Sequence, residues 1–334
     1  MTTPPVEYES KTRFLRALDH FWVKNQPFLL SVGFKLRPRY DPDWVPTGEN
    51  EDRMWGLNRD VLDAIRIHEG KKVVLKRVDT DSDELKIIQY LSQIDDSRNH
   101  TIPLLGIIPL PPDNASSLLV MPYTRQFDHP PFHCRAEFVE LMRQYLEGLQ
   151  FMHDNNVAHF DIAPQNLMMD ESRVVPAGSH FRKPRSHTGI PGIFSWRNRC
   201  SVGPVEYYYI DFGLSKIVID CAIQPIQSGR LPIGIDNATI DKALRAFRPV
   251  ADSMTSRNPQ DRPEPADSLA KLNIIAAKMS ARKLKTPMLV KEGQLTYMAQ
   301  TVISLFRNGY PPTERYEDLG YTTWVDRVFG IFGM

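Results

Sequence analysis

Two short segments of this 334-residue sequence carry side chains that could bind a hard cation and accept a proton. In 157–166 (VAHFDIAPQN), Asp161 is followed five positions later by Asn166. In 207–215 (YYYIDFGLS), an aromatic and apolar run ends at Asp211. Carboxylate and amide oxygens are the ligands that Mg²⁺ prefers. We therefore treat these residues as candidate catalytic and metal-binding residues, although a single aspartate is also a common turn residue.

Two residues of opposite charge stand earlier in the chain, and the lysine of the two could bind an anion. Lys76 ends the apolar run 73–75, and Glu84 follows eight positions later in a segment with helical periodicity. Each has a simpler interpretation. A strand lysine often extends its ammonium group into solvent, and Asp81 with Glu84 fits a capping box at a helix start. The functional interpretation therefore depends on the motifs around these residues.

The order of these segments resembles that of the eukaryotic protein kinase family. The run 157–166 resembles the catalytic loop H-R-D-x-x-x-x-N, and 211–213 resembles the D-F-G motif. The run 73–76 (VVLK) resembles the third-strand lysine motif. The resemblance covers roughly residues 60–216 and resumes at 247–272.

The resemblance implies that the chain binds ATP with Mg²⁺ and transfers a phosphoryl group. Asp161 would accept or orient the proton of the substrate hydroxyl, and Asn166 and Asp211 would hold the metal. Lys76 would neutralise phosphate oxygens and form an ion pair with Glu84. The implied nucleotide-binding residues are Lys76, Glu84, Val74, Met121, Pro122, Thr124, Met168 and Asp211.

Some of these residues would surround the adenine ring. Val74 stands where the family usually has alanine, and Met168 would form the opposite wall. Met121 would be the gatekeeper, the Pro122 carbonyl would accept from adenine, and the Thr124 amide would donate to it.

Several positions depart from the family pattern. No glycine-rich loop precedes the third-strand lysine, Phe160 replaces the catalytic-loop arginine, and Ala163 replaces a lysine of serine/threonine kinases. The run 254–263 (MTSRNPQDRP) resembles a late-helix signature. Only 51 positions separate Asp211 from Arg262 in that run, and no A-P-E motif is visible between them.

Three functions are compatible with this pattern. The first is an ATP-dependent protein kinase that phosphorylates serine or threonine hydroxyls of a protein substrate. The second is a catalytically impaired pseudokinase that acts as a nucleotide-binding or protein-interaction scaffold. The third is a kinase-fold enzyme that acts on small molecules. The complete set of base, metal and lysine residues favours the first, and the departures favour the second.

Hydrophobic periodicity predicts the elements that position these residues. We expect strands at 61–67, 72–78, 104–108 and 117–121, and helices at 13–21, 81–93, 135–152, 266–284 and 295–306. These elements predict a two-lobed α+β fold. The small lobe, 51–122, would contain an antiparallel sheet and one helix. The large lobe, 123–284, would be mainly helical, with a surface insertion at 171–204 and a shortened activation segment. Residues 1–50 would form an accessory segment and 285–334 a C-terminal extension.

Composition sets limits on compartment and partners. With 41 Lys+Arg against 40 Asp+Glu, the net charge of +1 predicts no nucleic-acid or membrane surface. The three cysteines include no CxxC pair, so we expect neither a disulfide framework nor a zinc site. The sequence shows no signal peptide or spanning segment. We therefore expect a cytoplasmic or nuclear monomer whose protein substrate the sequence does not identify.

Overall fold

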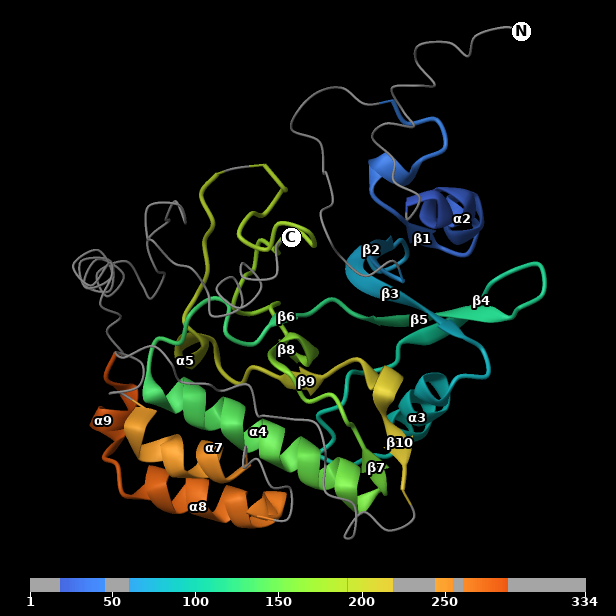
Figure 1. The fold of residues 1–334 in the computed structure, drawn as a ribbon. Helices are drawn as coiled ribbons and strands as arrows, with labels where there is room; N and C mark the ends of the chain where they lie inside the picture. Colours follow the sequence, from blue (N-terminus) through green and yellow to red (C-terminus); the bar gives the residue numbers. More distant parts are fainter. Residues whose placement is uncertain (1–18, 46–59, 191, 219–243, 255–260, 288–334) are drawn as a thin grey trace, which may run out of the picture. The chain divides into compact units, whose positions relative to one another are not determined.

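The computed structural model describes residues 19–45, 60–190, 192–218, 244–254 and 261–287 (Figure 1). These residues form two compact units. Unit 1 comprises the described parts of Met1–Ser82, Pro103–Tyr123 and Ser179–Pro191. Unit 2 comprises the described parts of Asp83–Ile102, Thr124–Gly178 and Gly192–Met334. Unit 1 is built on a sheet and unit 2 is mainly helical, so the predicted α+β class with two lobes is confirmed.

Unit 1 contains a five-stranded antiparallel sheet with strand order β1-β2-β3-β5-β4. Its strands are β1 (Phe34–Lys35), β2 (Val61–Arg66), β3 (Lys71–Asp79), β4 (Gly106–Pro109) and β5 (Ser116–Pro122). On β3, the buried Val73 and Leu75 alternate with the half-buried Lys72, Val74 and Lys76. Because side chains alternate between the two faces of a strand, one face of β3 points into the core.

The strands β2 and β3, which the sequence predicted at 61–67 and 72–78, form an antiparallel hairpin. The N–H of Gly70 donates to the carbonyl of Arg66 at 2.9 Å and closes the turn. Gly70 has a φ of +64°, a left-handed conformation that glycine adopts without steric cost.

An N-terminal helix, α2 (Asp19–Ser31), also belongs to unit 1. The sequence predicted a helix at 13–21, the first part of which lies outside the described residues. The observed helix continues through Pro27, which the prediction left out. An interior proline costs a helix about 3 kcal/mol. The buried side chains of Trp22 and Leu29 offset this cost by packing into the sheet's core. With β1, this helix makes part of the predicted accessory segment integral to the sheet unit.

Part of the predicted insertion also packs onto unit 1. The ammonium group of Lys72 donates to the carbonyl of Ser179 at 2.6 Å. The Tyr123 hydroxyl lies 3.0 Å from the Ser179 hydroxyl. Phe181 packs against the hydrophobic core of the sheet. Residues 179–190 therefore belong to the sheet unit, whereas the sequence placed them in the large lobe.

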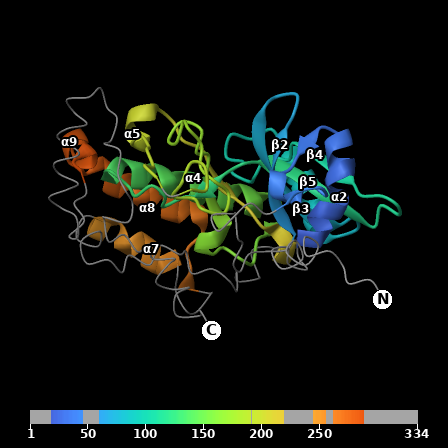
Figure 2. The same ribbon diagram turned by 90° about the horizontal axis from the view of Figure 1, so that it is seen from above.

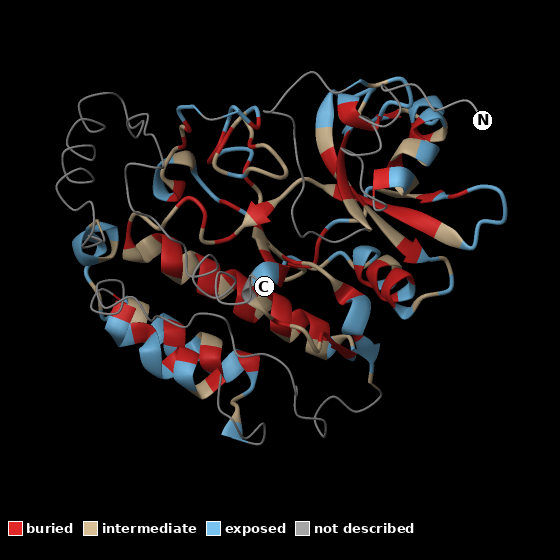
Figure 3. Cartoon of the chain, turned by 45° about the horizontal axis from the view of Figure 1, so that its top comes forward, coloured by how far each residue is buried: buried red, intermediate tan, exposed pale blue. Residues whose placement is uncertain are grey.

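Unit 2 is organised around α4 (Arg135–Asp154), the long helix that the sequence predicted. Its apolar stripe is buried as expected (Figure 3): Phe138, Leu141, Met142, Tyr145, Leu146, Leu149 and Met152. The helix α8 (Pro265–Ala277) packs along α4, and α7 (Arg248–Met254) packs against α8 (Figure 2). The predicted single helix at 266–284 is instead two helices. Ser280 caps the second, α9 (Ala281–Lys285), by accepting from the Lys283 N–H at 3.2 Å.

Short strands complete unit 2. A three-stranded antiparallel sheet has the order β6 (Arg125–Gln126), β8 (Leu167–Met169) and β9 (Tyr207–Tyr209). A two-stranded sheet pairs β7 (Val157–Ala158) with β10 (Lys216–Ile217). The helix α3 (Asp83–Ser92) packs against η3 (Phe212–Leu214).

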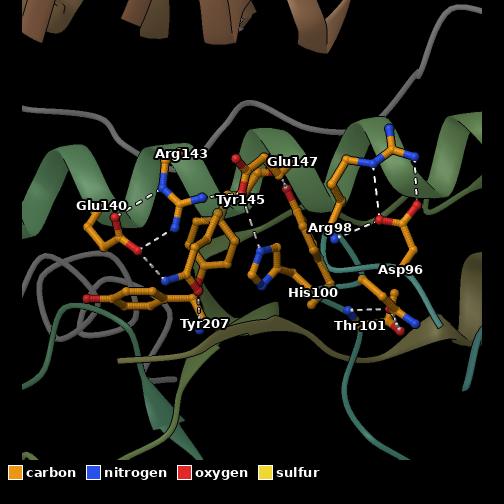
Figure 4. Close-up of polar contacts among 12 residues, drawn as sticks. Asp96, Arg98, His100, Thr101, Glu140, Arg143, Tyr145, Glu147 and Tyr207 are labelled. Carbon is orange, nitrogen blue, oxygen red and sulfur yellow. Dashed lines mark hydrogen bonds and ion pairs between the residues drawn. The ribbon is translucent and has the colours of Figure 1, made fainter. Parts of the chain in front are cut away.

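Polar contacts hold α4 against one segment before it and one segment after it in sequence (Figure 4). Nε2 of His100 lies 3.7 Å from a carboxylate oxygen of Glu147 on α4. The side chain of Gln144 donates to the Val205 carbonyl and accepts from the Tyr207 N–H, at 2.8 and 2.9 Å. These bonds fix α4 beside β9, the strand that leads to the candidate metal-binding aspartate.

The predicted surface insertion is better packed than its composition indicated. Val174, Val175, Phe194 and Trp196 are buried in unit 2. The short helix α5 (Arg199–Val202) follows them. These apolar residues gave no periodic signal because the segment contains little regular structure.

Several predictions lie outside the described residues. They concern the helix at 295–306, most of the C-terminal extension 285–334, the region 219–243, and the middle of the 254–263 signature. Among the helices that the structure describes, none has both the length and the apolar content needed to cross a lipid bilayer.

Candidate active site

The segment after α4 turns back sharply and delivers the catalytic-loop residues. Asn156 has a φ of +58°, which reverses the chain into β7, and Phe160 has a φ of +60°. Asp211 is also left-handed, with a φ of +64°. Of the four described non-glycine residues with positive φ, only Asn114 lies outside these two segments. Such strain is costly for a bulky residue like Phe160, and it often concentrates at functional sites.

His159 connects the segment 157–166 to the segment 207–215. Its Nε2 lies 3.0 Å from the Ile210 carbonyl, which can only accept, so Nε2 carries the proton. Nδ1 is therefore the acceptor for the Asp161 N–H, at 3.2 Å. The ring is fully buried and packs 4.8 Å from the ring of Phe212. Burial lowers the pKa of His159, which keeps the ring in this neutral tautomer.

Asn166 and Asp161 form the polar centre of the site. The Asn166 amide nitrogen donates to the Asp161 carboxylate at 2.8 Å and to the Asp161 carbonyl at 2.9 Å. Asn166 is buried and ends the turn η2 (Pro164–Asn166). Because its nitrogen is committed to Asp161, its amide oxygen is the atom that could ligate a cation.

The backbone of Asn166 also fixes the second segment. Its carbonyl accepts from the Ile210 N–H at 3.0 Å, which places the residue before Asp211 directly beside Asn166. Phe212, the residue after Asp211, is fully buried. Asp211 is therefore held between two anchored neighbours at the end of β9.

The carboxylate of Glu84, on α3, lies close to the D-F-G turn. A Cβ atom added at Gly213 would lie 3.4 Å from a carboxylate oxygen of Asp211 and 3.6 Å from a carboxylate oxygen of Glu84. Both carboxylates therefore lie beside the D-F-G turn. Because Gly213 has no side chain, it does not crowd them. Glu84 is buried, so it is not a solvated charge at the helix start.

Sequence reasoning missed the role of Ser215. Its hydroxyl donates to the His159 carbonyl at 3.0 Å, and its side chain is buried. The next residues form β10, which pairs with β7. Ser215 thus joins the segment after Asp211 to the catalytic loop. The only signal in the sequence is a serine between Leu214 and Lys216, which is too weak to identify such a contact.

The remaining candidates lie on the sheet of unit 1 or at the start of unit 2. Val74 pairs across strands with Met121, and Lys76 lies two residues further along the same face of β3. Pro122 ends β5. In unit 2, Thr124 follows that strand, and Met168 lies in the middle of β8. The structure thus brings Asp161, Asn166, Asp211 and Glu84 together in unit 2, and Val74, Lys76, Met121 and Pro122 in unit 1.

Comparison with known proteins indicates the family, although no protein-family model matches the chain. A probable casein kinase II subunit alpha homolog of Encephalitozoon cuniculi is 23% identical over 163 residues, which is 46% of this chain and 50% of that protein. A probable serine/threonine-protein kinase MRK1 homolog of the same organism is 25% identical over 127 residues, covering 35% and 39%. A putative serine/threonine-protein kinase R436 of Acanthamoeba polyphaga mimivirus is 27% identical over 88 residues, covering 26% and 29%. The chain carries a divergent protein-kinase-like domain.

The similarity to solved structures is weaker. A crystal structure of the Rad53 kinase domain and SCD2 is 18% identical, covers 66% of this chain and 87% of that chain, and has a TM-score of 0.40. The family assignment therefore depends on the curated relatives and on the order of motifs. The matched part spans half or less of each of these relatives.

The residues of the kinase-like domain fit the magnesium ion that the family implies. Asp211 offers carboxylate oxygens, and the hydrogen bonds of Asn166 leave its amide oxygen available. An all-oxygen donor set suits a hard cation. Bound there, Mg²⁺ would neutralise charge on phosphate oxygens.

Two departures of the kinase-like domain are visible in the structure. Phe160 occupies the position of the family's arginine and carries no charge that could bind a phosphate on an activation segment. Ala163 supplies only its carbonyl, which accepts from the Asn166 N–H at 2.9 Å. The segment 157–166 therefore lacks two charges that the family pattern includes.

Proposed function

We propose that this chain binds ATP with Mg²⁺ and transfers the γ-phosphoryl group to a serine or threonine hydroxyl of a protein. The observation that carries the proposal is the position of Asn166. Its side chain donates to Asp161, and its carbonyl binds the residue before Asp211. One residue thus links the candidate base to the candidate metal ligand. The names of the curated relatives, which include serine/threonine kinases, support the same reaction.

In this reaction, the substrate hydroxyl oxygen forms a bond to the γ-phosphorus, and the bond from that phosphorus to the bridging oxygen of ADP breaks. Asp161 orients the hydroxyl and accepts its proton. Asn166 holds the Asp161 carboxylate in place through the 2.8 Å hydrogen bond. Lys76 binds phosphate oxygens as a fixed positive charge.

A second function, a nucleotide-binding scaffold without transfer, is favoured by Phe160 and Ala163. Without the family's lysine at Ala163, fewer groups stabilise the transferring phosphate. Without the family's arginine at Phe160, no charge at that position binds a phosphate on the activation segment. The two functions differ in turnover and share nucleotide binding, so one pair of measurements separates them.

The first prediction concerns Asp161. Replacement by asparagine removes the proton acceptor but keeps a similar shape, so we expect phosphate transfer to a generic protein substrate to fall by about 10²–10⁴-fold. Transfer is measured with γ-labelled ATP, and stabilisation by Mg²⁺-ATP is measured by thermal shift. The Asp161→Asn variant should keep the ATP-dependent stabilisation, whereas Asp211→Ala should lose it.

Asp252→Asn is the matched control, because Asp252 is an exposed carboxylate of the same unit. This variant should behave like the unmodified chain in both assays. Absence of both transfer and ATP-dependent stabilisation in the unmodified chain would reject the enzyme function. Stabilisation that Asp211→Ala abolishes, without any transfer, would establish the scaffold function instead.

A further inference from the structure

A second group of side chains with strong ligand chemistry lies at the start of α4. His133, Cys134, Glu137 and Cys200 each place one donor atom so that all four atoms lie within 4.8 Å of one another. The catalytic loop follows the opposite end of this 20-residue helix, about 30 Å away along its axis. The group is therefore separate from the residues proposed for phosphate transfer.

Two distant segments contribute to this cluster. Cys134 immediately precedes α4 and is fully buried, while Cys200 lies on α5 in the insertion. Both thiols are free. Nδ1 of His133 lies 3.5 Å from Sγ of Cys200. Tetrahedral zinc holds sulfur at about 2.3 Å and nitrogen at about 2.0–2.1 Å, so its ligand atoms are about 3.5 Å apart. The separation of His133 Nδ1 and Cys200 Sγ matches this value. The four donor atoms all lie within 4.8 Å of one another, so a bound ion would draw them only slightly closer.

Glu137 forms hydrogen bonds with both segments. One carboxylate oxygen accepts from the His133 N–H at 2.7 Å, and the other accepts from the Cys200 N–H at 2.8 Å. The carboxylate is almost completely buried, and the guanidinium of Arg199 lies 3.8 Å away. Each of its oxygens keeps a second lone pair for a cation. Buried carboxylates usually need a positive partner, and a single guanidinium at 3.8 Å is a distant one.

Arg199 anchors the helix that carries Cys200. Its Nη2 donates to the carbonyls of Phe127 and Pro130, both at 2.7 Å. Its guanidinium also lies 4.7 Å from the ring centroid of Phe132. Cys134 and Glu137 are buried, His133 is partly buried and Cys200 is exposed. With two thiolates, one carboxylate, a divalent cation and Arg199, the formal charges of this cluster would sum to zero.

We propose that His133, Cys134, Glu137 and Cys200 bind one Zn²⁺ ion that joins the insertion to the start of α4. Two thiolates and an imidazole select zinc over the hard cations that prefer all-oxygen sites. Binding releases the thiol protons to solvent. The role is structural, because all four ligands come from the protein.

The experiment measures metal on the full chain purified in a non-thiol reductant. Elemental analysis should give one zinc per chain. After the metal is removed, titration with Co²⁺ should produce the intense visible bands of a tetrahedral ion and a thiolate-to-cobalt charge-transfer band. Cys134→Ser and Cys200→Ser should weaken Zn²⁺ binding by more than about 100-fold, beyond the 10–100-fold effect of residues outside the ligand shell. His133→Ala and Glu137→Gln should also weaken it.

Two control variants separate ligands from bystanders. Cys221→Ser removes the third cysteine, and His68→Ala removes an exposed histidine of the other unit. Both should bind Zn²⁺ as tightly as the unmodified chain. Circular dichroism checks that each variant is folded. The cobalt spectrum is recorded on the unmodified chain, so it tests the site even if a variant fails to fold.

Three results would overturn the proposal. The first is a reduced chain that retains no zinc and gives a cobalt spectrum without charge transfer. The second is unchanged Zn²⁺ affinity in Cys200→Ser. The third is a freshly isolated chain that holds a Cys134–Cys200 disulfide, seen by mass spectrometry as the loss of two hydrogens. None of these results depends on ATP, so they are independent of the proposed phosphate transfer.

Discussion

His159 shows how one buried side chain can hold a catalytic segment in place. Its protonated nitrogen binds the carbonyl before Asp211, and its other nitrogen binds the amide of Asp161. A protonated ring would have no acceptor for that amide. The low pKa of His159 and the geometry of Asp161 therefore depend on each other.

Ser215 supports the same loop from the other side, and its replacement is the second prediction. Ser215→Ala leaves the buried carbonyl of His159 without this donor. We expect the free energy of unfolding to fall by about 1–3 kcal/mol. Urea denaturation of the two proteins measures the difference.

Ser201→Ala is the control, because the Ser201 hydroxyl also donates to a carbonyl but is exposed to water. This change should cost less than about 0.5 kcal/mol. Equal stability losses in the two variants would show that the Ser215 hydrogen bond has no special role.

Individual site residues differed in how well the sequence predicted them. Asp161, Asn166 and Asp211 lie in short motifs, so the local sequence pattern was sufficient to select them as candidates. Ser215 acts through the carbonyl of His159, 56 positions away. Cys200 meets its partners 63 or more positions away. Contacts over such separations leave no periodic signal, so the spacing of the cysteines in the sequence could not indicate that Cys134 and Cys200 lie close together.

Secondary structure elements were predictable where one face alone is buried. The stripe of α4 and the hairpin of β2 and β3 follow from periodicity, because each element has one core side. The end of α2 was predicted too early, because Pro27 normally ends a helix and tertiary packing outweighed that preference. The irregular insertion was the least predictable part, although it supplies buried side chains to unit 2.

The insertion contains a histidine that gives the third prediction. Nδ1 of His180 accepts from the N–H groups of Arg182 and Lys183, at 3.3 and 3.2 Å. Burial and the nearby cations Arg37 and Lys72 lower the pKa of His180 to about 4. An unfolded histidine has a pKa of about 6.5. Between these values the unfolded chain binds more protons, so the free energy of unfolding falls as the pH is lowered.

His180→Asn removes this titration and should therefore flatten the loss of stability between about pH 6.5 and pH 4. Solvent screening of this half-buried group keeps its share of the slope below about 1.4 kcal/mol per pH unit. Urea denaturation across this pH range is the measurement. The exposed His68, replaced in the same way, should leave the slope unchanged. A His180→Asn chain with the slope of the unmodified protein would contradict the prediction.

At the scale of the whole molecule, each of the two units has a hydrophobic core and contains some of the candidate residues. Unit 1 contains Lys76 and three of the residues expected around adenine. Unit 2 contains the candidate base, the candidate metal ligands and Glu84. The insertion has residues in both units, since 179–190 belong to unit 1 and 192–204 to unit 2. The fold class and motif order were predictable from the sequence, but this division of the insertion was not.

The most direct test is the affinity of the full chain for ATP, measured by isothermal titration calorimetry with and without Mg²⁺. If Asp211 holds the metal, binding should depend on Mg²⁺, and Asp211→Ala should weaken it by at least about 10-fold, or about 1.4 kcal/mol. The exposed Asp252→Asn control should bind like the unmodified chain. No ATP binding, or Mg²⁺-dependent binding that survives Asp211→Ala unchanged, would contradict the assignment of this site.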